Sequence, residues 1–149
     1  MYTVEEFDNC KTKVMEYILY KKRTEYEVRK KFKGIIEDNM LEDIIEYVKE
    51  AGYINDAEYV KRLFNEYMTL KSMSIKELKN KVYSKGIDEN YIEDYMYENR
   101  EKLEEYEMNS AKKLIEKNKN SKDPQKLKMY LLNKGFELDI LKKIDEEDE

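Results

Sequence analysis

Apolar residues recur every three or four positions along most of the chain, which is the spacing of an amphipathic α-helix. Short polar stretches separate these apolar runs. In several of them Ser, Thr or Asn precedes Glu by three residues, a pattern typical of a capping box at a helix start. Several runs end at a glycine, which readily takes the left-handed conformation that follows a helix; these glycines are Gly34, Gly52, Gly86 and Gly135. The pattern predicts an all-α protein.

Capping residues indicate where the helices start. The predicted N-caps are Thr3, Thr24, Asn39, Asn55, Ser74, Asp88 and Asp123, the last of which is followed by a proline that suits the first helical turn. The first helix is expected to end near Tyr20 and the fourth near Leu70. No clean break is visible near Asn99, so the sequence leaves open whether the helix after Asp88 runs on into the next one. The last helix carries Leu138, Leu141 and Ile144.

The stretch 52–60 joins two predicted helices within a few residues. Gly52 ends the first of them, and the side chain of Asn55 can accept the free amide hydrogens of the second. Glu58 occupies the reciprocal position of a capping box. A junction this short fixes the angle between the helices, so a structural role is predicted and not a site of chemistry. Its residues are Gly52, Tyr53, Asn55 and Asp56.

The predicted helices repeat along the chain. The caps Thr24, Ser74 and Asp123, which open the second helix of each group of three, are spaced by 50 and 49 residues. The second and third copies also match at the apolar positions Leu78 and Val82, Leu127 and Leu131. Such self-similarity predicts three tandem three-helix repeats of about 50 residues that form an elongated, curved array. The predicted units are 1–52, 53–100 and 101–149.

Composition narrows the function classes. The chain contains no histidine, so the commonest acid–base residue and the commonest metal ligand are both missing. We therefore predict a protein that is not an enzyme, with no catalytic residue, metal ligand or cofactor site. The single cysteine, Cys10, excludes an intramolecular disulfide and fits a reducing cytosol. There is no apolar run of membrane-spanning length and no signal-peptide pattern, so a cytoplasmic location without membrane contact is expected.

The charges are segregated although the net charge is only −5. The windows 21–33, 71–86 and 122–134, each of which contains a second helix, carry net charges of +5, +4 and +3. In a regular array equivalent helices line the same side, so these windows predict a basic stripe on an acidic body. The candidate partner-binding residues are Arg29, Lys30, Lys31, Lys33, Lys76, Lys79, Lys81, Tyr83, Lys85, Lys126 and Lys128.

Other interpretations of these charges stay open. Runs of lysine often do no more than solvate a helix face, in which case the array would bind elsewhere. Direct nucleic-acid binding is disfavoured by the acidic net charge and by the lack of an identifiable base-reading residue. The acidic stretch 145–149 is predicted to be a solvated, frayed terminus, with a regulatory fold-back over the stripe as the alternative.

The junction sequence at 52–60 resembles that of the RecX family of regulatory proteins. Three further features of this chain are similar to that family: the Thr24-to-Glu27 opening of a second helix, the closures Lys85-Gly86-Ile87 and Lys134-Gly135-Phe136, and the repeat of about fifty residues. The resemblance covers nearly the whole chain. It departs at 71–74, where many relatives have a glycine-containing turn.

The resemblance implies a modulator of the RecA recombinase. Proteins of this family are held to bind RecA and its filament on single-stranded DNA, and to restrain filament growth, ATP hydrolysis, strand exchange and cleavage of the SOS repressor. It implies no catalytic residue and no cofactor. We expect a monomer, with at most weak direct contact to DNA; a helical DNA-binding module and a generic protein-interaction module are the alternatives.

Overall fold

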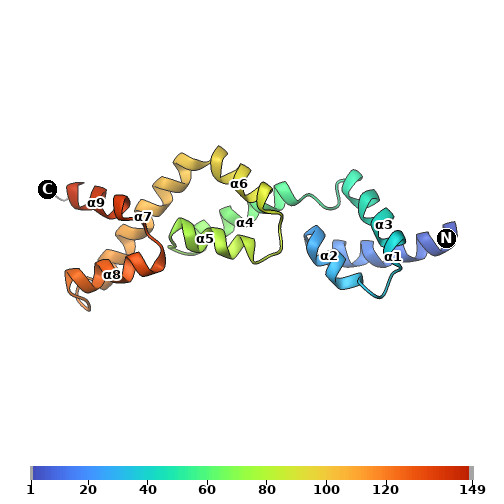
Figure 1. The fold of residues 1–149 in the computed structure, drawn as a ribbon, viewed down its shortest axis with the longest axis horizontal. Helices are drawn as coiled ribbons and strands as arrows, with labels where there is room; N and C mark the ends of the chain where they lie inside the picture. The colour runs from blue at the N-terminus through green and yellow to red at the C-terminus, as the bar shows by residue number, and fades with distance from the viewer. Residues whose placement is uncertain (1, 148–149) are drawn as a thin grey trace.

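The computed structural model describes residues 2–147, which form nine α-helices and, apart from an isolated bridge between Lys33 and Ile36, no β-structure. The helices are α1 (Val4–Tyr20), α2 (Glu25–Phe32), α3 (Asp38–Glu50), α4 (Asp56–Leu70), α5 (Ile75–Tyr83), α6 (Glu89–Glu98), α7 (Arg100–Asn118), α8 (Pro124–Lys134) and α9 (Leu138–Glu147). They follow one another along an elongated array with the two termini at opposite ends (Figure 1). The all-α fold is confirmed.

Most helices begin where the capping residues predict. Thr24 and Ser74 each form a complete capping box, with the side chains of Glu27 and Glu77 bonded back to the cap amides. Both cap side chains are fully buried, so these bonds satisfy polar groups that water cannot reach. The side-chain caps at Thr3, Asn55, Asp88 and Asp123 are also present.

The prediction that α3 starts from a cap at Asn39 is wrong. The N-cap is Glu37, whose carboxylate accepts from the amides of Asn39 and Met40 at 3.3 and 3.1 Å. Glutamate is not a preferred capping residue, but here its longer side chain folds back over two free amides and so replaces the expected asparagine.

The open question at Asn99 is resolved as a break between α6 and α7. The carbonyl of Tyr95 accepts both the backbone amide and the side-chain amide of Asn99, at 3.0 and 2.9 Å. Asn99 itself has φ −115° and ψ 23°, outside the helical region. An asparagine side chain that competes for the backbone in this way ends one helix without any glycine.

Three hydrophobic clusters follow one another along the array. The first is built on α1 to α3, the second on α4 to α6 and the third on α7 to α9. Ile54 packs in the first cluster and Leu103 in the second, and each comes from just beyond a predicted unit boundary. The boundaries of the units 1–52, 53–100 and 101–149 therefore stay a prediction, as does the curvature of the array.

Over residues 2–147 no helix combines the length and the apolar character needed to cross a membrane.

Residues 145–147 of the acidic stretch lie in the last turn of α9, where Glu147 pairs with Lys112 at 2.5 Å. Residues 148 and 149 lie outside the described part of the chain.

We expect Phe64→Ala to lower the free energy of unfolding by about 3–5 kcal/mol. Phe64 is fully buried and stacks on Tyr95 with a centroid distance of 4.3 Å, so the truncation leaves a cavity at the centre of the second cluster. Tyr97→Ala, at a ring that is 71% exposed, is the control. Urea unfolding followed by circular dichroism measures both, and equal losses would contradict the central position of Phe64.

Candidate partner-binding surface

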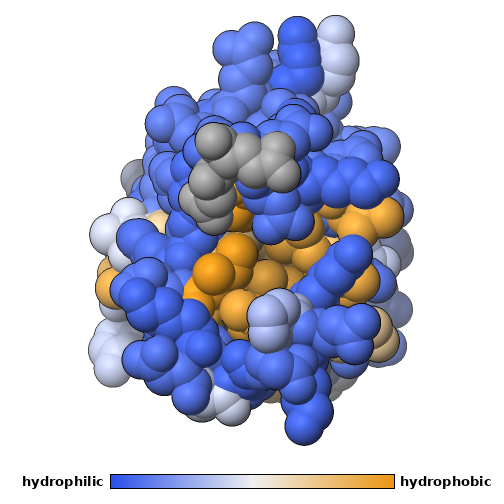
Figure 2. All heavy atoms as spheres, turned by 90° about the vertical axis from the view of Figure 1, so that its left-hand side faces the viewer, coloured by the Kyte–Doolittle hydropathy of each residue, from blue (hydrophilic) through white to orange (hydrophobic). Residues whose placement is uncertain are grey.

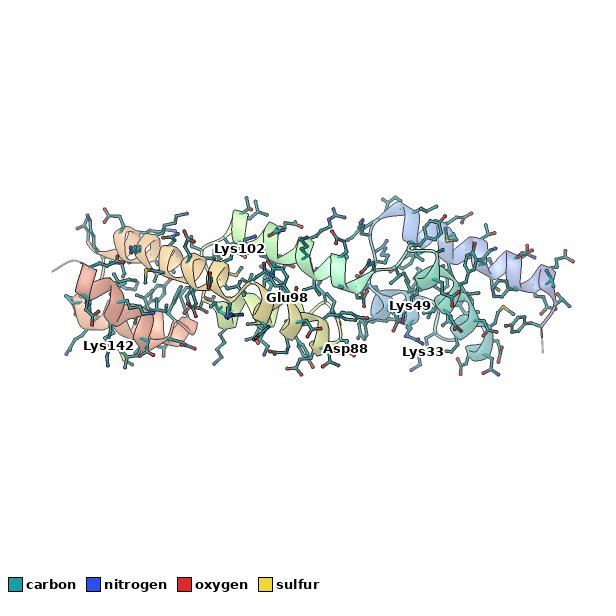
Figure 3. The ribbon with its side chains drawn as sticks, turned by 90° about the horizontal axis from the view of Figure 1, so that it is seen from above. Lys33, Lys49, Asp88, Glu98, Lys102 and Lys142 are labelled. Atoms are coloured by element: carbon teal, nitrogen blue, oxygen red, sulfur yellow. The ribbon has the colours of Figure 1, made fainter. Side chains whose placement is uncertain are left out.

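The three second helices lie on one side of the array. In Figure 1, α2, α5 and α8 run along the lower edge, and the third helices α3, α6 and α9 run along the upper edge. Most of the candidate partner-binding residues come from these second helices and the ends of their windows. In the view of Figure 3, charged side chains extend over the length of the array, from Lys33 near one end to Lys142 near the other.

The end of each later second helix rests on the start of the previous one. We call these two contacts the first joint, between α5 and α2, and the second joint, between α8 and α5. At the first joint Gly86, with φ 78°, lies so close to Tyr26 that a Cβ at this position would overlap the tyrosine ring. At the second joint a Cβ on Gly135 would lie 2.9 Å from the side chains of Ser74 and Lys76. Both glycines thus allow an approach that a larger residue would prevent.

The second joint is also hydrogen-bonded. The Ser74 hydroxyl donates to the carbonyl of Lys134 at 2.7 Å, and the Lys134 ammonium lies 3.6 Å from the Glu77 carboxylate. The same Ser74 side chain accepts from the Glu77 amide and so caps α5. One residue therefore opens a helix and binds the next unit.

At each joint a carboxylate of the following unit accepts a hydrogen bond from the first amide of a second helix. Asp56 accepts from the amide of Glu25, the first residue of α2, at 3.2 Å. Glu107 accepts from the amide of Ile75, the first residue of α5, at 2.6 Å. Free amides and the positive end of the helix dipole favour a carboxylate at this position.

Burial opposes the ionised form of both carboxylates. Glu107 is 2% exposed although it is an ionisable residue. Burial raises the pKa of Glu107 above its ordinary value, and hydrogen bonds from the backbone of Ile75 and Glu137 offset part of that rise. Burial likewise raises the pKa of Asp56, against the effect of the Glu25 amide.

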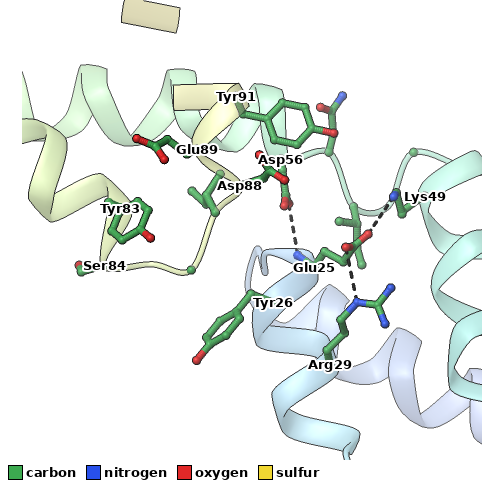
Figure 4. Close-up of a pocket in the computed structure, with 15 residues that line it drawn as sticks. Glu25, Tyr26, Arg29, Lys49, Asp56, Tyr83, Ser84, Asp88, Glu89 and Tyr91 are labelled. Carbon is green, nitrogen blue, oxygen red and sulfur yellow. Dashed lines mark hydrogen bonds and ion pairs between the residues drawn. The ribbon is translucent and has the colours of Figure 1, made fainter. Parts of the chain in front are cut away.

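A cleft of about 1080 Å³ lies at the first joint (Figure 4). Glu25 is central to it, because its carboxylate meets Lys49 at 2.8 Å and Arg29 at 3.5 Å. Arg29 also forms a two-pronged pair with Glu42, and that hydrogen bonding raises the pKa of Arg29 and lowers that of Glu42. The charges in this part of the cleft are therefore largely neutralised by one another.

A second groove, of about 520 Å³, runs beside the first joint on the side of the basic residues. Tyr26, which is 50% exposed, lies in its wall. Lys30 and Lys31 line it from α2, and Lys85 lines it from the end of α5. The fold thus brings Lys85 to two candidate lysines that precede it in the sequence by more than fifty residues.

The junction residues form the connection that the sequence predicts. Gly52 has φ 81°, and its amide and that of Tyr53 bond back to the carbonyls of Lys49 and Val48 at 3.0 and 2.8 Å. These two bonds are the hydrogen bonds of a Schellman motif. The Asn55 side chain then accepts from the Glu58 amide at 3.1 Å and opens α4.

No family model matches the chain. The regulatory protein RecX of Clostridioides difficile is 27% identical over 145 residues, which are 94% of this chain and 68% of that protein. The regulatory protein RecX of Staphylococcus haemolyticus is 31% identical over 132 residues, which are 85% of this chain and 49% of that protein. The crystal structure of RecX from Lactobacillus salivarius matches with a TM-score of 0.79 and 27% identity over 97% of both chains. The chain belongs to the RecX family.

This RecX-family chain spans about half the length of its staphylococcal relative and about two thirds of the clostridial one. Its structure divides the predicted stripe into two sets of residues. Arg29 and Lys79 are engaged within the chain, Lys79 with Glu93 at 2.5 Å. The exposed members are Lys30, Lys31, Lys33, Lys76, Tyr83, Lys85, Lys126 and Lys128.

Lys81 is a third case within the stripe, because it is half-buried. Its ammonium lies over the Tyr67 ring at 5.2 Å. The neighbouring Lys71 and Lys85 lower the pKa of Lys81, with the contact to Lys71 as the main cause. A like-charged cluster of this kind favours the approach of an anionic group.

The sequence did not point to Glu107, the buried acid of the second joint. Its spacing was a usable signal, since it lies four residues after Leu103 and four before Ala111, on the buried face of α7. In residues 2–147 no group of three or more His, Cys, Asp or Glu side chains is placed to hold a metal ion. The described residues therefore form surfaces suited to binding and two joints between units.

Gly86→Ala is expected to cost more stability than Gly34→Ala. The two glycines have φ of 78° and 79°, so both alanines carry the left-handed strain of roughly 1–2 kcal/mol. Only the alanine at Gly86 must also displace Tyr26, because a Cβ on Gly34 meets nothing within 4 Å. In a Tyr26→Ala background the two substitutions should cost the same. Thermal unfolding of the five variants tests this, and an unchanged excess cost in that background would contradict the contact.

The stability contributed by Glu107 should rise as the pH falls. Because its folded pKa lies above the ordinary 4.5, the native state takes up a proton while the unfolded chain is still ionised. The free energy of unfolding of the wild type, relative to Glu107→Gln, should therefore increase from pH 7 toward about pH 4.5. Glu105→Gln removes an exposed charge from the same helix and serves as the control. A constant difference across this range would contradict the burial of an ionisable group at the second joint.

Proposed function

We propose that this RecX-family protein binds the RecA recombinase and its filament on single-stranded DNA. Through that contact it restrains filament growth, ATP hydrolysis, strand exchange and cleavage of the SOS repressor. It acts in the cytoplasm as a monomer, without a catalytic residue or a cofactor. Membership of a family whose relatives are named regulatory protein RecX supports the proposal.

The observation that carries the proposal is the groove beside Tyr26, with Lys30, Lys31 and Lys85 around it. An exposed aromatic ring among lysines suits a partner surface that combines acidic and apolar groups. Exposed lysines also follow along the other second helices, Lys76 on α5 and Lys126 on α8. A row of similar basic sites on an elongated body can contact successive subunits of a filament, which raises the affinity for the filament over that for a single subunit.

Such binding regulates only if it discriminates between filament states. A ligand shifts an equilibrium by no more than its difference in affinity for the two states. Inhibition by this protein therefore requires that it bind different states of the filament with different affinity. This difference would slow growth without any chemistry by the protein.

Direct DNA binding is the second candidate. The same lysines together with the exposed rings of Tyr26 and Tyr83 could hold single-stranded nucleic acid by phosphate contacts and base stacking. Such binding would not need RecA and would weaken steeply with salt, whereas the net charge of −5 opposes it. A generic protein-interaction module, the third candidate, would leave RecA unaffected.

Purified protein is expected to lower the ATP turnover of RecA on single-stranded DNA and to reduce the mass of filament that sediments. The reason is that protein bound to the filament shifts the balance from its growth toward its loss of subunits. Both quantities are measured with increasing protein, and the same titration without RecA detects direct DNA binding. No change in either quantity at a few-fold molar excess over RecA would contradict the proposal.

The triple variant Lys30→Glu/Lys31→Glu/Lys85→Glu should weaken the effect on RecA by about tenfold or more, equivalent to about 1.4 kcal/mol. It reverses the groove charges and spares Lys79, whose loss would also break its pair with Glu93. The control is Lys13→Glu/Lys142→Glu/Lys143→Glu, which makes the same change of charge on exposed positions of α1 and α9. If the two triple variants inhibit RecA equally, the interface lies elsewhere.

A further inference from the structure

An apolar groove of about 430 Å³ opens at the C-terminal end of the array, between α7, α8 and α9. Figure 2 looks at this end of the molecule and shows a hydrophobic hollow inside a hydrophilic rim. Ile115 from α7, Leu127 and Leu131 from α8, and Leu141 from α9 line it. Lys119, Lys122 and Lys128 lie among its polar lining residues. Part of the third hydrophobic cluster is therefore accessible from outside.

The equivalent residues of the middle unit show what fits such a groove. Leu127, Leu131 and Leu141 lie 49 residues after Leu78, Val82 and Ile92. In the middle unit those three residues are fully buried and pack with Leu103 from the start of α7. In the middle unit the first turns of α7 therefore cover the side on which the groove lies in the last unit, where the three leucines are 2–9% exposed.

The covering helix also uses an aromatic side chain. The Tyr106 hydroxyl donates to the carbonyl of Lys71 at 2.6 Å and accepts from the amide of Met73 at 3.0 Å, in the loop between α4 and α5. In the last unit the corresponding loop between α7 and α8 contributes Lys119 and Lys122 to the groove. Within α7, which covers the middle unit, Leu103 and Tyr106 lie three residues apart, a spacing that places both side chains on one face of the helix.

The last unit lacks the backbone amide donor that the first position of the second helix supplies at both joints. The amides of Glu25 and Ile75, at the first position of α2 and α5, bind the carboxylates that close the two joints. The first position of α8 is Pro124, which has no N–H. A helix bound here as α7 binds the middle unit would therefore lack that hydrogen bond and would be held by its apolar and acidic side chains.

The charge around the groove favours an acidic occupant. Its lining contains three lysines and one acidic residue, Asp145. The first two turns of α7, which cover the middle unit, carry Glu101, Glu104, Glu105 and Glu107 against Arg100 and Lys102, and so are net acidic. Glutamates at such positions of a bound helix would lie within reach of the lysines on the rim.

We propose that this C-terminal groove binds an acidic amphipathic helix of a partner protein. The helix inserts a leucine and an aromatic side chain, three residues apart, between α7, α8 and α9. Its acidic residues meet Lys119, Lys122 and Lys128. The recognition follows the helix-in-groove mode, in which one apolar face supplies the anchors and the flanks supply specificity. It is independent of the proposed action on RecA and can be tested without that protein.

The probe is a fluorescein-labelled peptide with the sequence of residues 99–110, which carries the leucine, the tyrosine and the glutamates. Within the chain its own site is already filled by α7, so the C-terminal groove is the matching site left open. Fluorescence anisotropy with the full chain should show saturable binding. A peptide with Ser at the leucine and tyrosine positions, and one with Lys at the glutamate positions, should each bind at least tenfold more weakly.

Protein variants locate the site. Lys122→Glu/Lys128→Glu should weaken peptide binding by about tenfold, whereas Lys13→Glu/Lys61→Glu, the same change of charge at exposed positions of α1 and α4, should not. Ile115→Glu, at a half-buried position of the groove, should abolish binding, and circular dichroism shows whether the variant is folded.

Three results would overturn the proposal. The first is equal binding of the peptide that lacks its two anchors. The second is wild-type affinity of the folded groove variants. The third is self-association of the protein that Ile115→Glu removes while no peptide binds, because the groove would then be an interface between copies of the chain. Analytical ultracentrifugation measures the third.

Discussion

The arrangement of the units depends on the contacts that the first turns of α2 and α5 make with the following unit. The free amides at the start of α2 and α5 donate to a carboxylate of the following unit, and a glycine of that unit rests on the same turn. Each joint therefore combines directional hydrogen bonds with a close approach that only glycine allows. Together with Ile54 and Leu103, which pack into the cluster of the preceding unit, these contacts set how neighbouring units are oriented.

The caps, the cores and the repeat were predictable from the sequence because their signals are local. Ser74 and Glu77, for example, need only their spacing of three residues to form a capping box. The cap at Glu37 was missed because its long side chain is an uncommon substitute for asparagine at this position. The contact of Gly86 with Tyr26 was missed for another reason, namely that it joins residues of different units and depends on their relative orientation.

The basic stripe was likewise predictable only in part, because its contacts depend on how the units are oriented. Charge windows indicated the second helices, but they did not distinguish Arg29, which is paired with Glu42, from Lys30, which is exposed. Ion pairing within the chain reduces the part of a charge that a partner can use, because the first pairing must be given up or shared. The groove beside Tyr26 arises only once α5 is set against α2, so its lysines could be named from the sequence but not grouped.

The two joints give the array a direction, and proline at position 124 limits how it can be extended. At both joints the earlier unit supplies the amide donor and the later unit supplies the acceptor, so units can be joined in only one order. A unit that starts its second helix with proline can follow another unit but cannot be followed in the same way. Lengthening such a protein by copying the middle unit in place would thus keep an amide–carboxylate bond at every joint, whereas a copy added after the last unit would lack one.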